Sequence, residues 1–397
     1  MKASIVACWI LLAALCGMLG ESSRTQAQSK AAAQQPIPMI RFALHGNAAQ
    51  VPASFIGNLV FLPVRVNQSQ PSLFQLDSAA AMSSIDPNRA SELGVADAQS
   101  PTLNLSDLDI LLPRLTEVPN QEFAAEVGRT YEGTLGADFF RALVVEVDYG
   151  RQTVRLYDPA AYKYSGPGKP LHLTFSSGLP VLQAKFVAGN KRIEGNFIVN
   201  TALDSSVRIS ETYARSHRLS MSRIKTIPVA AENSGGEILV IGRLKQFEIG
   251  PFAIPAPLGE FEAGKPDWND AKIAGEIGGG VLRRFGVVFD YTREQVFLDP
   301  NSQYRDDESE DMSGISIIAN GPGLKRFVVT QVLSGTPGAE SGIQKGDLIA
   351  GVDDEAAADL NLIAIRDLFR QVGHSYKLLI ERNGQTRTVT IRMKRLL

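Results

Sequence analysis

The sequence contains an internal repeat made of two short blocks that recur in the same order. Residues 74–79 (Phe-Gln-Leu-Asp-Ser-Ala) are matched 123 positions later by residues 197–202 (Phe-Ile-Val-Asn-Thr-Ala), each at the end of an apolar, strand-like run. A second pair of blocks begins at residues 135 and 277, which are 142 positions apart. Such a repeat predicts two similar lobes, of which the second holds 19 more residues between its blocks.

Length and composition restrict the class of protein. The chain has 397 residues, which is too long for one ordinary core and suggests two or three domains. A hydrophobic content of 44% and a charged content of 21% are typical of a globular protein. The net charge of −2 gives no basic surface for nucleic acid, so we expect no nucleic-acid partner.

The first 27 residues have the pattern of an export signal peptide. Lys2 precedes an apolar stretch over residues 3–19, and a small-residue site ends at Ala27. This predicts export to the periplasm or the extracellular space. An uncleaved signal anchor is the competing interpretation and the only membrane contact we expect. Both cysteines, Cys8 and Cys16, fall inside this leader, so the mature chain has no disulfide.

The rest of the chain has mainly β patterning. Short apolar runs over residues 61–66 and 74–76 flank a turn-forming segment, and this hairpin delivers Asp77. A second hairpin, over residues 179–199, delivers Asn200 in the same way. A helix is expected after each delivery point, the first capped by Asp86 and the second starting at Ser210.

These residues carry a family resemblance. The turn beginning at Asp77 resembles the Asp-Thr/Ser-Gly turn of pepsin-like and retropepsin-like aspartic proteases. The Leu-Gly and Ile-Gly pairs at 135–136 and 277–278 resemble the hydrophobic-hydrophobic-Gly element behind that turn. The resemblance implies a mainly β, bilobal aspartic-protease-like barrel fold. It assigns residues 36–166 to lobe 1 and residues 167–300 to lobe 2.

The resemblance also implies a catalytic pair in which Asp77 has a degenerate partner, Asn200. Two facing carboxylates share one proton, so that one activates water while the other polarises the carbonyl. Asn200 cannot ionise or share a proton, and an acid/base partner contributes about 10²–10⁴ in rate. Ser78 and Thr201 retain the hydroxyls that the family uses to lock its two turns together. The family's turn glycines are replaced by Ala79 and Ala202.

Several alternatives remain for the missing carboxylate. Asp204 could turn inward, or two chains could pair their first lobes and bring two Asp77 side chains together. The site could also serve for binding instead of cleavage. The simplest alternative makes Asp77 an ordinary turn residue that accepts hydrogen bonds from the local backbone.

A flap is expected over the cleft in the second lobe. Gly235 and Gly236 lie between two runs with strand patterning, which favours a flap hairpin, although an ordinary hairpin turn fits as well. The corresponding stretch of the first lobe, residues 101–122, contains no glycine. We therefore expect a single arm over the cleft.

The C-terminal region follows an acidic segment, residues 301–311, which is expected to be a solvated linker. Residues 335–349 (GTPGAESGIQKGDLI) closely resemble the PDZ domain of bacterial envelope proteases, where a short helix starts at the Pro and a Gly-Asp turn launches the next strand. The resemblance covers residues 312–397. It implies a small β-barrel with two helices.

A PDZ domain binds an extended peptide by strand addition and holds its terminal carboxylate with loop amides. By this resemblance the peptide-binding residues on the loop and strand are Ser313, Gly314, Ile315 and Ile317. The helix expected over residues 362–372 should face them with its apolar side. That side carries Ile365, Leu368 and Phe369, for which core packing is an equally good interpretation. We expect partners with a hydrophobic C-terminal residue.

Other chemistries find little support. The four histidines, His45, His172, His217 and His374, are scattered and have no Cys or Glu at ligand spacing. The glycines at 278–280 are not followed by the Lys-Ser/Thr of a phosphate loop, and no Gly-x-Ser-x-Gly turn is present. We expect no metal and no cofactor.

Two functional hypotheses follow. In the first, the chain is an exported aspartic-peptidase-like protein with a PDZ module that binds extended polypeptides, with peptidase activity weak or absent. In the second, it is an aspartic-type endopeptidase in which Asp77 is catalytic and the PDZ domain selects substrates. Whether the purified protein cleaves an unfolded polypeptide, and whether Asp77→Ala abolishes the cleavage, separates them.

Overall fold

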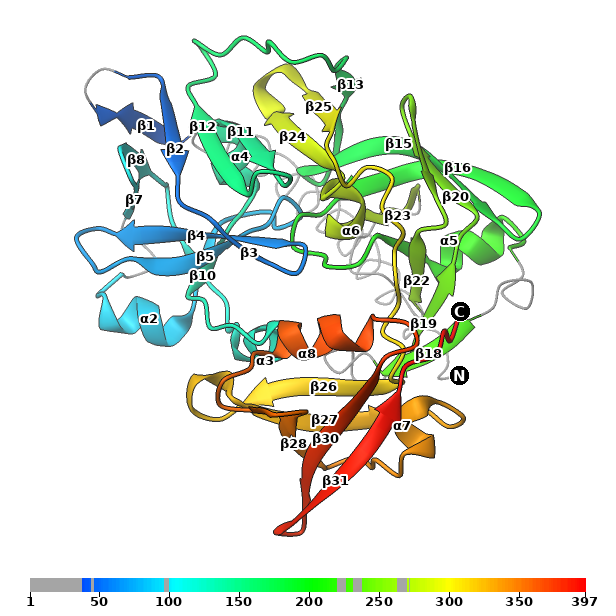
Figure 1. Ribbon diagram of the computed structural model, residues 1–397. Helices are drawn as coiled ribbons and strands as arrows, with labels where there is room; N and C mark the ends of the chain where they lie inside the picture. The colour runs from blue at the N-terminus through cyan, green and yellow to red at the C-terminus, as the bar shows by residue number, and fades with distance from the viewer. Residues whose placement is uncertain are drawn as a thin grey trace, which may run out of the picture. The chain divides into compact units, whose positions relative to one another are not determined.

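The computed structural model describes residues 38–43, 46–95, 100–219, 226–230, 238–262, 270 and 272–397. The predicted signal peptide therefore lies outside the described residues. Within this part of the chain, no helix combines the length and the apolar character needed to cross a membrane. The described chain is mostly strand, arranged in four sheets, with short helices between them (Figure 1).

Lobe 1 contains twelve strands and three helices among its described residues. They are β1 (Met39–Phe42), β2 (Ala48–Val51), β3 (Ser54–Ile56), β4 (Leu59–Val66), β5 (Ser72–Leu76), β6 (Ser84–Ile85), α2 (Pro87–Glu92), β7 (Thr102–Leu105), β8 (Leu108–Leu111), β9 (Thr116–Glu117), α3 (Gln121–Val127), β10 (Gly133–Leu135), α4 (Ala137–Ala142), β11 (Val144–Asp148) and β12 (Thr153–Tyr157).

Lobe 2 follows with a similar series of elements. They are β13 (Leu171–His172), β14 (Thr174–Ser176), β15 (Leu179–Ala188), β16 (Lys191–Val199), β17 (Val207–Ser210), α5 (Glu211–Ser216), β18 (Thr226–Ala230), β19 (Ile238–Arg243), β20 (Gln246–Ile249), β21 (Phe252–Pro255), β22 (Leu258–Glu262), β23 (Ile273–Ile277), α6 (Gly279–Leu282), β24 (Phe285–Asp290), η3 (Tyr291–Arg293) and β25 (Gln295–Pro300).

The two lobes build their main sheets in the same strand order. Lobe 1 runs β9-β6-β10-β5-β4-β7-β8, and lobe 2 runs β22-β17-β23-β16-β15-β20-β21. In each lobe the strand that leads into the repeated turn, β5 or β16, pairs in parallel with the strand of the Gly element, β10 or β23. Lobe 2 adds the β18–β19 hairpin at the edge of β22. This hairpin accounts for the longer second lobe that the repeat predicts.

Local sequence explains the elements nearest the two repeated turns. The β4–β5 turn places Asn67 at a φ of +56°, a region that Asn tolerates better than most residues. Asp86 caps α2 by accepting a hydrogen bond from the Asn88 amide, with Pro87 in the first turn. Ser210 caps α5 by accepting from the Tyr213 amide. Both predicted helices are confirmed.

The glycines behind the two turns are required by close chain crossings. A Cβ on Gly136 would lie 2.5 Å from the backbone carbon of Met82, and one on Gly278 would collide with the backbone oxygen of Ser205. The amide of Gly278 donates to the Ser206 carbonyl across the crossing. A side chain at either glycine would push the Gly element away from its turn.

The lobes share a sheet and a core. Strand β11 of lobe 1 pairs with β24 of lobe 2 in the six-stranded sheet β13-β25-β24-β11-β12-β2. Val145 pairs with Phe289, Glu146 with Val288 and Val147 with Val287. Beneath this sheet the Phe140 ring of lobe 1 stacks on Tyr291, with ring centroids 5.3 Å apart. Both rings are buried, and burying an aromatic ring stabilises a fold by about 1.5–3 kcal/mol.

The C-terminal unit has its own sheet and core. Its order is β26-β27-β28-β30-β31, with β29 beside β28. The elements are β26 (Ile315–Asn320), η4 (Pro322–Leu324), β27 (Arg326–Val332), α7 (Pro337–Glu340), β28 (Leu348–Val352), β29 (Glu355–Ala356), α8 (Leu362–Phe369), β30 (Ser375–Arg382) and β31 (Gln385–Arg392). The predicted fold class, a mainly β bilobal body followed by a small β unit with two helices, is confirmed.

The expectation of a solvated acidic linker is confirmed for Arg305, Asp306 and Asp307, which are exposed, and wrong for Glu310. Glu310 is buried and accepts hydrogen bonds from the amides of Leu396 and Leu397, and it forms a 2.6 Å ion pair with Arg243. Burial alone would raise the pKa of Glu310, but these amides and the guanidinium hold it below the ordinary value. Glu308 accepts from the Ser206 hydroxyl at 2.6 Å. The end of the segment is packed because the carboxylates of Glu308 and Glu310 have partners far away in the sequence.

Candidate functional site

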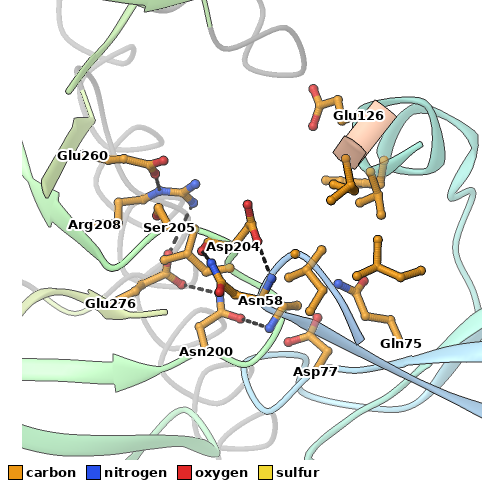
Figure 2. A pocket seen from close by; sticks show the side chains of 18 of the residues that line it. Asn58, Gln75, Asp77, Glu126, Asn200, Asp204, Ser205, Arg208, Glu260 and Glu276 are labelled. Atoms are coloured by element: carbon orange, nitrogen blue, oxygen red, sulfur yellow. Dashed lines mark hydrogen bonds and ion pairs between the residues drawn. The ribbon is translucent and has the colours of Figure 1, made fainter. Parts of the chain in front are cut away.

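Asp77 and Asn200 occupy equivalent positions in the two lobes. Asp77 follows β5 and donates its backbone amide to the Leu135 carbonyl at 3.0 Å, while Asn200 follows β16 and donates to the Ile277 carbonyl at 2.9 Å. Both side chains line the same cavity, and Figure 2 shows them on its floor. The repeat therefore pairs the residues that the fold brings into one site.

Ser78 and Thr201 hold the two turns together. The Ser78 hydroxyl donates to the Val199 carbonyl at 2.6 Å, and the Thr201 hydroxyl donates to the Leu76 carbonyl at 2.7 Å. Each hydroxyl also accepts the backbone amide of the other residue, at 3.1 and 3.0 Å. Both side chains are fully buried. This reciprocal set of four hydrogen bonds fixes Asp77 and Asn200 relative to each other.

The pKa of the Asp77 carboxyl group is raised above its usual value. Burial raises the pKa of Asp77 from 3.8 to about 6, although its oxygen accepts hydrogen bonds from the amides of Ala79 and Ala80, which lower it. These bonds measure 2.9 and 3.0 Å. A carboxyl group with this pKa exchanges its proton near neutral pH. Asp77 therefore both accepts hydrogen bonds from its own turn and has a raised pKa.

The amide of Asn200 is bound on both of its atoms. Its oxygen accepts from the Ala202 amide at 2.9 Å, as Asp77 accepts from Ala79. Its nitrogen donates to Glu276 at 2.9 Å, and Figure 2 shows this bond on the floor of the cavity. Glu276 is buried on β23. The bond to Glu276 fixes which way the Asn200 amide faces.

Glu276 belongs to a charged network that the sequence interpretation missed. Arg208 on β17 pairs with Glu276 at 3.3 Å and with Glu260 on β22 at 3.2 Å. Figure 2 shows Arg208 between the two carboxylates. The 142-residue offset of the repeat aligns Glu276 with Thr134, which in lobe 1 shares a 2.7 Å hydrogen bond with Ser84. The sequence signal that could have revealed Glu276 was this difference between the two blocks, a carboxylate in lobe 2 where lobe 1 has a hydroxyl.

Asp204 takes no part in a carboxylate pair with Asp77. Its side chain accepts from the Asn58 amide at 2.7 Å, and its carbonyl accepts from the Asn58 side chain at 2.7 Å. Figure 2 shows the Asp204 carboxylate turned towards Asn58. Asp204 therefore ties the β3–β4 turn to lobe 2.

The cavity around these residues has a volume of about 1840 Å³. Lobe 1 contributes Asp77, Thr134 and Phe123 among others, and lobe 2 contributes Asn200 and Glu276. The C-terminal unit also contributes to the lining, through β26, α8 and the loop before β26. A cavity of this size accommodates several residues of an extended polypeptide.

The predicted flap glycines, Gly235 and Gly236, lie outside the described residues. The strands on either side of them, β18 and β19, do pair as a hairpin. Ile227 on β18 and Ile241 on β19 line the cavity. The paired strands therefore border the cleft in lobe 2, and the flap itself stays a prediction.

The loop before β26 contains a glycine in the left-handed conformation. Gly314 adopts a φ of +69°, and a Cβ there would collide with Thr336. Gly314, Ile315 and Ile317 line the cavity. Ser313 is buried, and its hydroxyl accepts the Ile315 amide at 3.1 Å. A terminal carboxylate at this loop therefore competes with Ser313 for the Ile315 amide.

Of the two interpretations of the apolar face of α8, the structure supports core packing over contact with a ligand. Ile365 and Phe369 are completely buried in the core of the C-terminal unit, and Leu368 packs against the same core. The cavity is lined instead by Ile363, Arg366, Asp367 and Arg370. Helical periodicity identified an apolar face, and tertiary packing uses that face for the core.

No cluster of His, Cys, Asp and Glu suited to a metal ion occurs among the described residues. The four carboxylates nearest the floor, Asp77, Asp204, Glu260 and Glu276, are instead bound to amides or to Arg208.

Comparison with known proteins assigns the C-terminal unit. Residues 304–393 match the family model of the PDZ domain, so this part of the chain is a PDZ domain. No curated protein sequence matches the chain. A similar solved structure is the aspartic proteinase from Irpex lacteus, at 13% identity and a TM-score of 0.42, covering 64% of this chain and 98% of that chain.

A second solved structure, the photosystem II D1 C-terminal processing protease, is similar over a short stretch. It is 27% identical with a TM-score of 0.19, and the match covers 21% of this chain and 22% of that chain.

Proposed function

We propose that this protein binds extended polypeptides in the cleft between its two lobes, with peptidase activity weak or absent. The observation that supports the proposal is the arrangement of Asn200. The Ser78–Thr201 interlock sets Asn200 opposite Asp77, while the Asn200 amide nitrogen is bound to Glu276. A peptidase of the resembled family needs a shared proton at this position, and an amide has none to share.

The site retains what binding requires. The main-chain framework of both turns is intact, the cavity is large, and apolar side chains such as Ile227, Ile241 and Phe123 line it. PDZ domains bind peptides by adding a strand to an open sheet edge, and β26 is an edge strand of its sheet. The cleft between the lobes is therefore suited to extended polypeptide, whereas on β26 the Ile317 carbonyl is already bound by Arg366.

The test uses the full mature chain and unfolded casein between pH 4 and pH 7. We expect saturable binding in a fluorescence anisotropy titration and no cleavage products on a gel. Cleavage that disappears in Asp77→Ala would overturn the proposal. Asp107→Ala is the matched control, because Asp107 is an exposed carboxylate in the same lobe.

One observation favours the alternative, an aspartic-type endopeptidase in which Asp77 is catalytic. Burial raises the pKa of Asp77 to about 6, which suits a group that takes up and releases a proton at mildly acid pH. In that case the PDZ domain selects substrates. The expected signature is a slow rate with an apparent pKa near 6 that Asp77→Asn eliminates.

Export of the protein is part of the same proposal. The signal-like pattern of residues 1–27 predicts a mature protein outside the cytoplasm. Cell fractionation followed by N-terminal sequencing tests it, with Gln28 expected as the first residue. An intact N-terminus in a membrane fraction would favour the signal anchor instead.

A further inference from the structure

Helix α3 of lobe 1 lies against β26, which is an edge strand of the PDZ sheet (Figure 1). A peptide that binds a PDZ domain by strand addition needs the free edge of such a strand. In this chain the edge already has a neighbour, and lobe 1 supplies it. The PDZ domain is therefore in contact with the two-lobed body at the place where a ligand would enter.

The Arg366 guanidinium on α8 joins the two elements. It donates to the Glu126 carbonyl on α3 at 2.8 Å and to the Ile317 carbonyl on β26 at 3.0 Å. The Glu126 carbonyl lies in the last turn of α3, where carbonyls have no partner within the helix and a cation is favoured. On an edge strand, a carbonyl would otherwise accept from the amide of an added strand. One side chain thus caps the helix and takes the place of an incoming amide.

The apolar part of this contact is small. Leu324 of η4 packs against a cluster of lobe 1 that contains Ala124 and Tyr131. Gly128, the left-handed residue that ends α3, lies so close to α8 that a Cβ there would come within 2.6 Å of the Leu362 Cβ. Leu362 is fully buried in the PDZ core and has no room to move aside. A small contact between two folded units is of the kind that opens and closes.

Helix α3 is itself held lightly in lobe 1. It is seven residues long, has no side-chain cap at its N-terminus, and buries Ala124 as its one buried residue. A helix of this length is not stable without tertiary contacts. Elements with few buried side chains are also the ones that open at the lowest cost in free energy.

The PDZ domain has a second attachment, which is to lobe 2. Glu310, just before the domain, pairs with Arg243 of lobe 2 at 2.6 Å. Glu310 also accepts from the amides of Leu396 and Leu397 at the other end of the domain. Both ends of the PDZ domain are therefore fixed at one place, away from α3. This arrangement allows the domain to turn about the Glu310 attachment while that attachment stays intact.

We propose that α3 and Arg366 form an autoinhibitory latch on the PDZ domain. In the closed state β26 accepts no further strand, and in the open state the domain turns about Glu310 and frees the edge. The latch goes beyond the proposed function, because it controls a different surface and operates whether or not the cleft between the lobes binds polypeptide. Since the open fraction alone binds a peptide, the closed state weakens the measured affinity in proportion to its population.

The first measurement follows opening without any ligand. The mature chain expected after cleavage contains no cysteine, so Asp107→Cys in lobe 1 and Thr386→Cys on β31, both at exposed positions, accept a pair of dyes for single-molecule energy transfer. Opening separates the PDZ domain from lobe 1 and changes the transfer efficiency. We expect a single main closed population in the otherwise unaltered chain, and an open population about tenfold larger or more once the latch is broken.

Two variants break the latch from opposite sides. Arg366→Met removes both hydrogen bonds and keeps an apolar stem, and Arg392→Met, at an exposed arginine of the same domain, is its control. Gly128→Ala sets a Cβ against Leu362. Its control is Gly94→Ala, because Gly94 is also a left-handed glycine that follows a helix of lobe 1 but has no atom within 4 Å of an added Cβ. Thermal unfolding checks that each variant is folded.

The second measurement is the affinity for a fluorescent peptide that ends in Val as the free acid, followed by anisotropy with the full mature chain. We expect Arg366→Met and Gly128→Ala each to bind this peptide about tenfold more tightly than wild type, or better. Arg392→Met and Gly94→Ala should stay within about twofold of wild type. The order of the four affinities should follow the order of the open populations.

Three results would overturn the latch. A wild-type chain that binds the peptide as tightly as both latch variants has no closed state. A gain of affinity in Arg366→Met without one in Gly128→Ala would mean that Arg366 acts on the peptide directly and not through α3. Variants that open without any gain of affinity would make the contact with α3 a structural joint. Binding of casein in the cleft is measured separately, so none of these results decides the proposed function.

Discussion

The two lobes share one framework and differ in the chemistry placed on it. In lobe 1 the strands behind the turn, β10 and β6, carry Thr134 and Ser84, whose hydroxyls share a 2.7 Å hydrogen bond. In lobe 2 the corresponding strands, β23 and β17, carry Glu276 and Arg208. The neutral pair accompanies an ionisable turn residue, Asp77, and the charged pair accompanies an amide. This difference indicates that the Asn200 amide and the buried Glu276 carboxylate beside it depend on each other.

The strongest test of this dependence is conversion of lobe 2 to the residues of lobe 1. Asn200→Asp alone should give no peptidase activity, because the new carboxylate faces Glu276 and two adjacent carboxylates cannot both ionise. Asn200→Asp with Glu276→Thr removes that conflict and should raise cleavage of unfolded casein by about 10²-fold or more over wild type. Initial rates at pH 5 measure it.

Glu276→Thr alone is the control for that experiment and should give no gain. If Asn200→Asp alone produced the full increase, Glu276 would be irrelevant to the choice of Asn200. If the double variant also stayed inactive while folded, the cleft would be missing other groups that catalysis requires besides the two carboxylates.

The interlock between the lobes should contribute strongly to stability. Ser78→Ala removes the donor to the Val199 carbonyl and the acceptor of the Thr201 amide, and leaves both buried. We expect the free energy of unfolding to fall by about 2–4 kcal/mol. Urea unfolding followed by circular dichroism measures the change. Ser100→Ala, at an exposed hydroxyl, should stay within about 0.5 kcal/mol of wild type.

Making lobe 1 resemble lobe 2 should change the pH dependence of stability. The folded pKa of Asp77 is raised from 3.8 to about 6, so its protonated form stabilises the fold below pH 3.8, and that stability is lost as the pH rises through 6. Asp77→Asn should therefore be more stable than wild type at pH 7, by about 1–2 kcal/mol after allowance for partial solvent access.

The stability difference between Asp77→Asn and wild type should shrink towards zero at pH 4. Urea unfolding across this range measures it. A difference that is independent of pH would contradict the raised pKa. Asp107→Asn, at an exposed carboxylate of the same lobe, should show no such gain at pH 7.

The smallest expected effects compare the helix caps of the two lobes. Asp86→Ala and Ser210→Ala each remove one cap, on α2 and α5 respectively. Each should lower the free energy of unfolding by about 1 kcal/mol. Replacement by Ser at Asp86 and by Asp at Ser210 should restore most of the loss. A cap whose removal has no effect would show that its helix depends on packing alone.

The sequence predicted those features that depend on local pattern or on the repeat. Asp86 and Ser210 cap their helices because the capping pattern is local, and the repeat paired Asp77 with Asn200 because both turns have the same flanking strands. The repeat also predicted a longer excursion in lobe 2, where the structure has the β18–β19 hairpin.

The remaining features depend on contacts between distant segments. Glu276 meets Asn200 because β23 runs parallel to β16, and no local pattern gives this pairing. Glu310 was expected to be solvated because its partners, Arg243 and the last two residues, are far away in sequence. On α8 the apolar pattern could not distinguish Ile363, which lines the groove, from Ile365, which lies in the core.

The ladder between β11 and β24 has a consequence for how such a chain can arise. Its register is symmetric, since Val145 pairs with Phe289 and Val147 with Val287, and the repeat makes Val287 the counterpart of Val145 and Phe289 the counterpart of Val147. A half-length ancestor would possess the same self-complementary edge and could close this sheet as an isologous homodimer. Gene duplication and fusion would then have left one of the two turn positions free to diverge while the other stayed acidic.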